Sequence, residues 1–298
     1  MLTIAYITCR EDPKIGWFFD SLKRQILPED EIKVVVVSHY ELSWLNPPIY
    51  DGVTFTKPKP TVWQGEYRLT ARNYFAPSNS RNTAICLAPD GWIAFVDDLS
   101  VLLPGWLSAV REAMKGKKII LGAYKKMKNL FVENGEAQSF TEFQAGLDSR
   151  WNSGRIEGPV PAAGGWLFGC SFAAPVEALL KVNGLDENCD SCGGEDYCLG
   201  IRLENAGYEF IYDLRMLTYE SEEHHYIGEP FIRMDKGKSP KEKSHALLNM
   251  ALKSKYAPNY FGEGGIRSLR EKILRGQSFP IPQIPDRDFF DGQKLSEM

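Results

Sequence analysis

The sequence has no long apolar run and no segment typical of an export signal. Its longest charge-free stretch, Gly158 to Val176, contains three prolines and four glycines, which disfavour a membrane-spanning helix. The first residues, Met1 to Ile7, form an apolar stretch with no basic region and no small-residue cleavage site. We therefore expect a soluble, cytoplasmic protein with no membrane span.

Cysteine is present but is not arranged as a disulfide framework. Six cysteines are spread along the chain, and without an export signal we expect them to be reduced thiols. The pair Cys189-x-x-Cys192 lacks the second pair or the histidines that a zinc site needs, and it lacks a thioredoxin-like context. We interpret both residues as ordinary loop cysteines, with a metal or redox role as the alternative.

Positive charge is in deficit overall but is concentrated in one segment. The formal net charge is −4, yet residues 231–275 hold eleven Lys and Arg against four Asp and Glu, a balance of +7. Such a segment can hold a diphosphate, dock on an anionic acceptor, or form a solvated helix face. The acidic remainder of the chain argues against a broad nucleic-acid-binding surface.

The 298 residues suffice for one large α/β domain with an elaborated tail. Apolar runs typical of buried strands alternate with segments of helical spacing. The strand-like runs are 2–8, 31–38, 92–96 and 119–123, and the helix-like segments are 17–26, 106–114, 175–182 and 195–206. This alternation predicts an α/β fold with a mostly parallel central sheet, helices on both faces, and ligands at the carboxyl ends of the strands. The pattern leaves the shape of residues 125–155 unassigned.

Two acids end the third predicted strand. The run Trp92 to Val96 is followed at once by Asp97 and Asp98, and the polar segment Asn79 to Ala84 precedes it. Acids at the carboxyl end of a buried strand face the ligand crevice, where two together can hold a divalent cation against a diphosphate. The alternative is that they cap the following helix.

Two further acids begin the last predicted helix. Gly193 and Gly194 allow a tight backbone turn, and Glu195 and Asp196 then lie in the first helical turn at the mouth of the sheet. An acid in this place can accept the proton of an attacking hydroxyl group. Helix capping is again the alternative, because acids in a first turn complement the helix dipole.

Both sets of residues resemble the family-2-type glycosyltransferases of the GT-A fold. The first strand, Ile4 to Thr8, and the segment Asp20 to Gln25 belong to the same resemblance. Gly164-Gly165-Trp166 and Gly-Gly-Glu-Asp are similar, more specifically, to the Golgi galactosyltransferases and to galactosyltransferase-like modules of polysaccharide polymerases. The resemblance implies a GT-A catalytic domain over residues 1–226, followed by a basic lid or tail over 227–298 packed on it.

The resemblance implies a role for each matching position. The nucleotide-sugar donor would contact the loop after the first strand, the segment before the third strand, the end of that strand and the Gly-Gly-Trp stretch, namely Thr8, Arg10, Glu11, Arg81, Asn82, Asp97, Gly165 and Trp166. A divalent cation, Mn2+ or Mg2+, would be bound by Asp98 and His225. Asp196 would be the catalytic base, and Glu195 would contact the acceptor sugar.

Three positions depart from the family pattern or admit another interpretation. Leu99 stands where the family usually has its second metal-binding acid, so the cation would be held differently or mainly through the diphosphate. Ser38 and His39 stand where the second strand usually ends in an acid that reads the nucleotide base. His225, in an acidic loop beside His224, alternatively forms a surface ion pair.

Together these features predict an inverting hexosyltransferase that moves a sugar from a nucleotide sugar, with UDP as the favoured nucleotide, to a hydroxyl group of a saccharide or glycoconjugate. A nucleic-acid acceptor is the less favoured alternative. A non-catalytic carbohydrate-binding protein is suggested by Trp63, Trp106, Trp151 and Trp166, whose rings can stack on sugars, although most tryptophans belong to cores. A nucleotidyltransferase is disfavoured because no Gly-rich phosphate loop follows the first strand.

Overall fold

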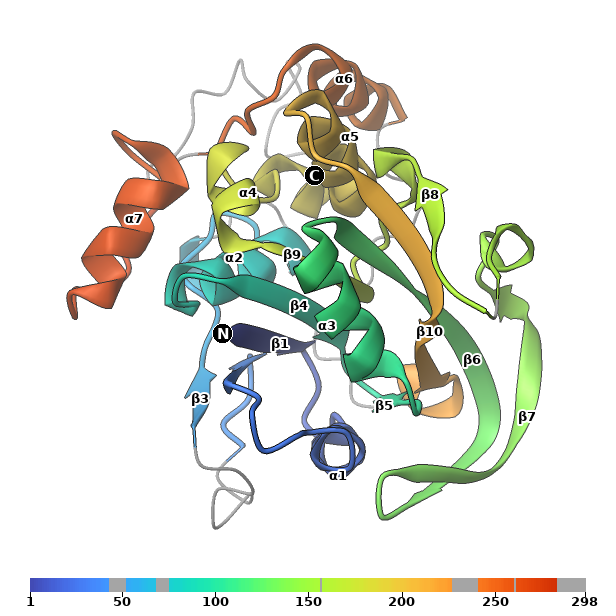
Figure 1. Cartoon of the computed structure of the whole chain (residues 1–298). Coiled ribbons are helices and arrows are strands. Elements are labelled where there is room, and N and C mark those ends of the chain that lie inside the picture. The colour runs from blue at the N-terminus through green and yellow to red at the C-terminus, as the bar shows by residue number, and fades with distance from the viewer. Residues whose placement is uncertain (43–51, 68–74, 156, 227–240, 260, 283–298) are drawn as a thin grey trace.

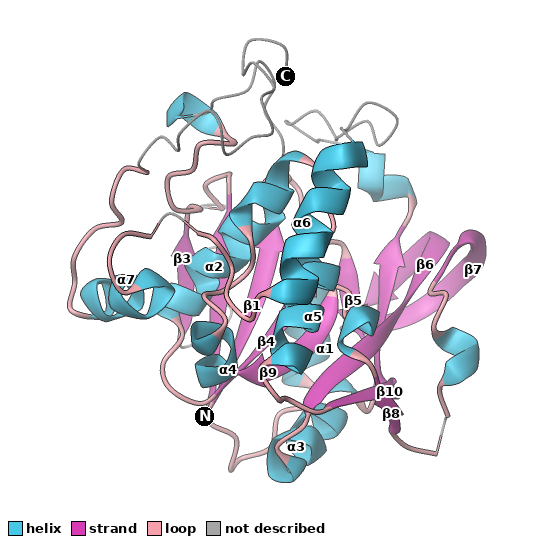
Figure 2. Cartoon of the chain, turned by 90° about the horizontal axis from the view of Figure 1, so that it is seen from above, coloured by secondary structure: helices cyan, strands magenta, loops and turns pink. Residues whose placement is uncertain are grey.

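A computed structural model of the chain describes residues 1–42, 52–67, 75–155, 157–226, 241–259 and 261–282. A large twisted sheet forms its centre and helices cover both faces (Figures 1 and 2). The strands are β1 (Leu2–Thr8), β2 (Ile32–Ser38), β3 (Val53–Thr56), β4 (Trp92–Asp97), β5 (Ser100–Leu102), β6 (Ile119–Glu133), β7 (Glu136–Leu147), β8 (Val160–Ala162), β9 (Ser171–Pro175) and β10 (Phe210–Ser221).

The main row of strands has the order β3-β2-β1-β4-β9-β6-β10-β5, with β7 paired to β6 and β8 to β10. The ladders of β1 with β2 and β4, of β2 with β3, and of β6 with β10 are parallel. Strands β9 and β5 run antiparallel to their neighbours. Within the described residues, β9 and β5 are thus the reversed strands of this row, and the prediction of a mostly parallel sheet is confirmed.

Alternation along the strands builds a separate apolar layer on each face. In β1, Ile4 and Tyr6 belong to one core and Ala5 and Ile7 to the other, because successive side chains point to opposite faces. The helices are α1 (Ile15–Lys23), α2 (Pro77–Leu87), α3 (Trp106–Gly116), α4 (Val176–Lys181), α5 (Glu195–Asn205), α6 (Lys241–Lys253) and α7 (Gly265–Leu274). Helices α1 and α3 contribute to the first core, and α2, α4 and α5 contribute to the second.

The region that the sequence left unassigned is a long hairpin of β6 and β7. Strand β6 extends ten residues beyond the predicted end at residue 123. Asn134 and Gly135 connect the two strands, both with positive φ, 51° and 75°. A two-residue turn of this kind matches the right-handed twist of paired strands, and Asn-Gly is its preferred sequence.

Helix α2 was not predicted, and its composition explains why. Its residues from Ser78 to Thr83 are all polar, yet all are buried. Asp190 accepts hydrogen bonds from the backbone N–H groups of Ser78 and Asn79 at 2.7 and 3.0 Å, so a distant carboxylate caps the helix start. Neither periodicity nor a local capping residue reveals such a helix.

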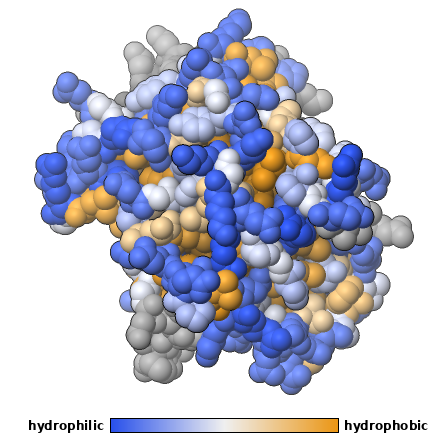
Figure 3. Space-filling model, viewed as in Figure 1, coloured by the Kyte–Doolittle hydropathy of each residue, from blue (hydrophilic) through white to orange (hydrophobic). Residues whose placement is uncertain are grey.

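The C-terminal helices pack on the main body. Helix α6 contacts α5, and α7 contacts α2 and α4; Arg270 of α7 donates to the Ala88 carbonyl at 2.9 Å. Residues 227–240, where the predicted lid begins, lie outside the described residues, and the boundary at 226 stays a prediction. None of the described helices has the length and apolarity needed to cross a membrane. Apolar residues are scattered over the mostly hydrophilic face in Figure 3.

Candidate active site

The candidate site lies where the parallel strands end. The carboxyl ends of β1, β2 and β4 share one edge of the sheet because the three strands are parallel neighbours in register, with Thr8 opposite Ser38 and Ile7 opposite Asp97. Helices α2 and α5 bring further charged side chains to the end of β4. The structure therefore places the two acidic pairs of the sequence near one another.

Asp98 is held by the loop that follows β1. Its Oδ2 accepts a hydrogen bond from the Thr8 hydroxyl at 2.7 Å and pairs with Arg10 Nε at 3.1 Å. Burial raises the pKa of the Asp98 carboxyl to about 6, although Arg10 and Thr8 both act to lower it. Arg10 is only 3% exposed, whereas Glu11, beside it, is exposed. Asp98 thus ties the end of β4 to the loop that follows β1.

Leu99 does not offer its side chain to the crevice. It is 1% exposed, and its backbone has φ 61°, a conformation uncommon for residues other than glycine. Its N–H donates to the Tyr6 hydroxyl at 3.2 Å, and that hydroxyl donates to the Pro13 carbonyl at 2.6 Å. The position that departs from the family pattern is therefore part of the core.

Arg81 of α2 links the two acidic pairs. One of its terminal nitrogens donates to Asp97 at 2.7 Å and the other to Glu195 at 3.4 Å, and the residue is 2% exposed. Gly169 makes this position possible, because a Cβ there would lie 2.5 Å from Arg81 Nη2. The neighbouring Asn82 is buried and exchanges hydrogen bonds with the Leu185 backbone, so it fixes the turn before α5.

Glu195 and Asp196 begin α5 as predicted. Asp196 accepts hydrogen bonds from the N–H groups of Gly169 at 3.3 Å and Tyr197 at 2.7 Å, which fixes the orientation of the carboxylate. Burial and the charge of Asp196 raise the pKa of the Glu195 carboxyl, and Arg81 opposes that rise. The turn thus presents one acid in contact with arginine and one held by backbone donors.

The Gly-Gly-Trp stretch lies against the same helix. Gly165 meets the ring of Tyr197, since a Cβ on this glycine would lie 2.8 Å from Tyr197 Cε2. Trp166 is partly buried and packs edge to face with Tyr212, with centroids 6.0 Å apart. Tyr197 is 40% exposed beside Asp196; sequence reasoning did not single it out as a site residue.

A third carboxylate near the strand end was also missed. Glu220 of β10 lies partly buried opposite Ser100 of β5. Burial first, then the charges of Asp97 and Asp98, raise the pKa of Glu220 to about 8. Its Oε1 is enclosed and has no hydrogen-bond partner in the part of the chain that the structure describes. The sequence did not predict β10. Without that strand, the alternation of its side chains could not be used to place Glu220 near Asp97 and Asp98.

A pocket of about 400 Å³ opens beside the ends of β2 and β3. His39, which follows β2, and Lys57 and Lys59, which follow β3, line it together with Gln64 and Tyr67. Burial lowers the pKa of His39 to about 4, so this imidazole is neutral at physiological pH. His39 therefore offers this pocket an uncharged ring.

Few of the described side chains are placed to bind a divalent cation. No group of three or more His, Cys, Asp or Glu side chains is placed to hold a metal among the described residues. Asp98 is engaged by Thr8 and Arg10, whereas the side chain of Asp97 is 36% exposed. The side chain of His225 lies outside the described residues, so its predicted role is not tested. A cation bound here would therefore have Asp97 as its accessible carboxylate ligand of this pair and would need its other ligands from a bound substrate.

Several alternatives from the sequence can be placed in the structure. Cys189 and Cys192 are buried with Leu247 and Ala251 of α6 in one apolar cluster, and none of the six cysteines, all within the described ranges, forms a disulfide. Trp63 and Trp106 are 1% and 0% exposed. These two tryptophans therefore belong to the interior and offer no ring to a sugar.

Comparisons with known proteins give structural likeness without sequence likeness. The sequence matches no protein-family profile and no curated protein sequence. The crystal structure of S. aureus TarS matches 74% of this chain, with a TM-score of 0.50 and 15% sequence identity. The structure of TarS residues 1–349 in complex with UDP also matches 74% of this chain, with a TM-score of 0.50 and 13% sequence identity. The structure of GalNAc-T7 with UDP, GalNAc and Mn2+ matches 74% of this chain as well, with a TM-score of 0.52 and 10% sequence identity.

These likenesses establish the fold. The matched region spans 36% of TarS, 60% of its 1–349 fragment and 43% of GalNAc-T7, so this chain corresponds to part of each. The α/β architecture is the GT-A glycosyltransferase fold, as the resemblance in the sequence predicted. At these identities the likeness does not extend to donor, acceptor or mechanism.

Proposed function

We propose that this chain is an inverting glycosyltransferase that moves a hexose from a nucleoside-diphosphate sugar to a hydroxyl group of a saccharide or glycoconjugate. The observation that carries the proposal is the bridge of Arg81 between Asp97 at the end of β4 and Glu195 at the start of α5. It holds the strand end, where the GT-A fold receives its nucleotide sugar, beside the helix turn that bears Asp196.

In the proposed reaction the acceptor oxygen attacks the anomeric carbon of the donor sugar. A bond forms between these two atoms, the bond from the anomeric carbon to the diphosphate oxygen breaks, and the nucleoside diphosphate leaves with the bonding electrons. Asp196 accepts the proton of the acceptor hydroxyl. Its fixed carboxylate suits this role, since a general base must lie within hydrogen-bonding distance of the proton that it removes.

The donor would lie along the edge formed by β1, β2 and β4. The pocket beside His39 suits the nucleotide base, because a neutral imidazole and the Gln64 amide can contact an uncharged ring. UDP is the favoured nucleotide. Lys57, at the same pocket, adds positive charge towards the diphosphate, whereas the ammonium group of Lys59 is paired with Glu187 at 2.7 Å.

A divalent cation would neutralise charge on the leaving diphosphate. We propose that Asp97 is its contact with the described part of the protein, since each of the two acids pairs with an arginine but the side chain of Asp97 is 36% exposed and that of Asp98 only 13%. The earlier assignment of Asp98 and His225 as ligands stays a prediction. Comparing UDP affinity with and without Mn2+ in Asp97→Asn and Asp98→Asn separates the two assignments.

The proposal is tested by nucleoside-diphosphate release and by one substitution. Wild-type protein, incubated with a panel of sugar nucleotides and neutral saccharide acceptors, should release the diphosphate. Asp196→Asn should lower turnover at least about 100-fold, because the amide keeps the shape but cannot accept the proton. Calorimetry should show UDP affinity within about twofold of wild type.

Glu204→Gln is the matched control, since Glu204 is an exposed acid on the same helix. It should leave turnover and UDP affinity unchanged. Near wild-type turnover in Asp196→Asn would instead make Asp196 a helix-capping residue. Saccharide binding without release from any sugar nucleotide would favour the non-catalytic carbohydrate-binding protein.

A further inference from the structure

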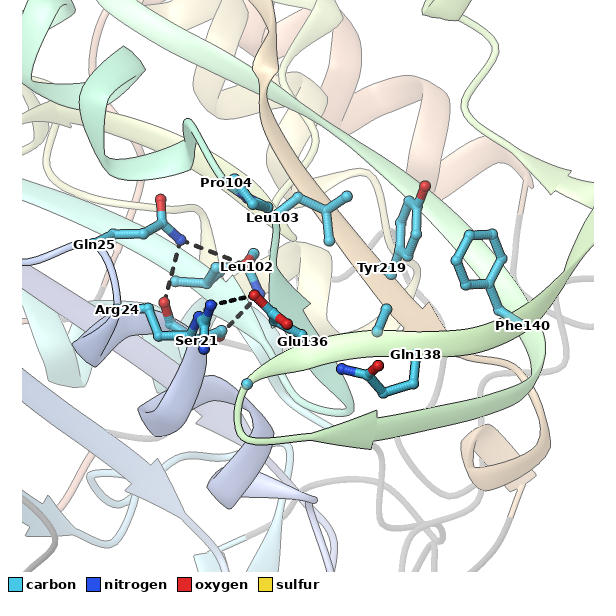
Figure 4. Close-up of a pocket in the computed structure, with 12 residues that line it drawn as sticks. Ser21, Arg24, Gln25, Leu102, Leu103, Pro104, Glu136, Gln138, Phe140 and Tyr219 are labelled. Carbon is cyan, nitrogen blue, oxygen red and sulfur yellow. Dashed lines mark hydrogen bonds and ion pairs between the residues drawn. The ribbon is translucent and has the colours of Figure 1, made fainter.

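A second pocket, of about 420 Å³, is drawn in Figure 4, and none of the candidate active-site residues lines it. Its walls come from the end of α1 and the residues after it, the end of β5 and the loop to α3, the turn between β6 and β7 with the first residues of β7, and β10. The lining residues that concern its chemistry are Arg24, Gln25, Glu136, Gln138, Phe140 and Tyr219. Its size is within the range of small-molecule sites in proteins.

The pocket is held in shape by contacts between its walls. Gly135, at the hairpin turn, reaches the backbone of α1 so closely that a Cβ there would lie 2.3 Å from the Ser21 nitrogen. Arg24, directly after α1, forms an ion pair with Glu136 just beyond that turn. Gln25 is fixed by accepting from the Leu107 N–H at 3.1 Å. The hairpin thus spans from the sheet to α1 and leaves a preformed space beneath it.

This pocket and the candidate active site use opposite sides of β10. Tyr219 lines the pocket, whereas the adjacent Glu220 lies near Asp97 and Asp98, as expected because successive side chains of a strand alternate. The pocket is also lined by α1, which packs on the face of the sheet opposite to α2 and α5. Those two helices supply Arg81, Glu195 and Asp196. A ligand can therefore occupy it without entering the active site.

The lining combines aromatic rings with hydrogen-bonding groups and a balanced charge. Phe140 is 42% exposed, and its ring meets that of Tyr219 edge to face with centroids 4.9 Å apart. Gln138 is exposed at the rim. Arg24 and Glu136 are the charged residues of the described lining, and they pair with each other. The pocket thus offers apolar ring surface and polar groups without a net charge.

We propose that this pocket binds a neutral saccharide. The C–H faces of a sugar ring can pack on Phe140 and Tyr219, and its hydroxyl groups can pair with Gln138, Arg24 and Glu136, whose side-chain groups donate and accept hydrogen bonds. A phosphate or a nucleotide is disfavoured, because Arg24 is already neutralised by Glu136. The inference goes beyond the proposed function and does not depend on it, since binding here requires neither donor nor transfer.

Saturation-transfer NMR and calorimetry with cellobiose, lactose, maltose and N,N′-diacetylchitobiose test the proposal in the absence of any nucleotide. At least one of these neutral disaccharides should bind to the wild-type protein. Phe140→Ala should weaken that binding about tenfold, the typical cost of truncating an aromatic anchor. Gln138→Ala should weaken it less, by about threefold, roughly the net contribution of one hydrogen bond.

Phe131→Ala is the matched control. Phe131 is an exposed aromatic residue of the same hairpin, 57% exposed, that does not line the pocket, and its removal should leave affinity within about twofold of wild type. Phe140 is itself exposed, so its substitution should not unfold the protein, and thermal melts verify this. Saturating UDP should not displace the disaccharide.

Three results would overturn the inference. The first is that none of the four disaccharides binds to the wild-type protein. The second is binding that survives Phe140→Ala unchanged, and the third is binding that UDP or Asp196→Asn abolishes, which would place the sugar in the active site. None of these results bears on nucleoside-diphosphate release, so a failure here is distinguishable from a failure of the proposed function.

Discussion

Helix α5 carries charged side chains in two different settings. At its first turn, Glu195 and Asp196 lie with Asp97 around a single arginine, Arg81, so carboxylates outnumber guanidinium groups. Farther along, Arg202 Nη2 pairs with Asp186 Oδ2 at 2.9 Å, and both residues are 0% exposed. Arginine is buried in both places, but only the second pair is balanced.

This difference indicates that the Arg202 pair has a structural role, whereas the acids around Arg81 are suited to a chemical one. Asp186 also accepts a hydrogen bond from the Asn188 N–H, so the Arg202 pair ties the last turn of α5 to a turn that precedes the helix. At the first turn, burial and then the charge of Asp196 raise the pKa of Glu195, and the side chain of Asp97 is 36% exposed. An interior normally avoids such an imbalance, and perturbed carboxyl groups gather at functional sites. The following substitutions test this contrast.

Arg202→Met should cause the largest loss of stability. It leaves the Asp186 carboxylate buried without its guanidinium partner, and breaking a buried pair in this way typically costs about 3–5 kcal/mol. Urea denaturation at pH 7 measures the free energy of unfolding. Arg267→Met is the control, because Arg267 and Glu177 form an exposed pair, and we expect a loss below about 1 kcal/mol. Equal losses in both variants would contradict the anchoring role.

Arg81→Met should destabilise the fold less, and in a pH-dependent way. Without Arg81, repulsion from Asp97 and Asp196 raises the pKa of Glu195 further. The folded state then keeps a proton that the unfolded state has lost, so stability falls as pH rises above the ordinary pKa of glutamate. We expect a loss of about 1–3 kcal/mol at pH 8 and a smaller loss at pH 6. The same loss at both pH values would show that Arg81 merely fills space.

The acids around the first turn of α5 could be predicted from the sequence, whereas the buried pair of Arg202 and Asp186 could not. Asp97 and Asp98 end a clear strand, and Glu195 and Asp196 begin a clear helix, so the place of each pair in its element could be predicted. The pair of Arg202 and Asp186 joins residues sixteen positions apart through a turn, and no periodicity encodes which of many charged residues will be buried together.

Other misses have equally specific causes. Helix α2 is polar and buried, which inverts the pattern that identifies helices, and its N-terminal cap comes from Asp190, over a hundred residues away. The β6–β7 hairpin did carry a local signal, Asn134-Gly135, which matches the preferred two-residue turn. Because Glu220 was found only through the ladder of β10 with β5 and β6, its place beside Asp97 required the tertiary structure.

Glu220→Gln should cost the least stability of the three substitutions and should sharpen the contrast most directly. The pKa of Glu220 is about 8 in the folded state, so between the ordinary glutamate pKa and pH 8 the folded protein binds a proton that the unfolded chain has released. Its contribution to stability is therefore full at low pH and is lost as pH rises through this window.

The substitution removes that titration, so the free energy of unfolding should fall less between pH 5 and pH 8 in the variant than in the wild type. A pKa of about 8 corresponds to a change of roughly 3 kcal/mol over this pH range. We expect a difference of about 1–3 kcal/mol, because Glu220 is only partly buried and water relieves part of the cost of burying its charge. Glu209→Gln, which removes an exposed acid just before β10, should leave the pH dependence unchanged. Parallel pH profiles for wild type and Glu220→Gln would mean that Glu220 ionises normally and that the surplus of acid at this site is confined to β4 and α5.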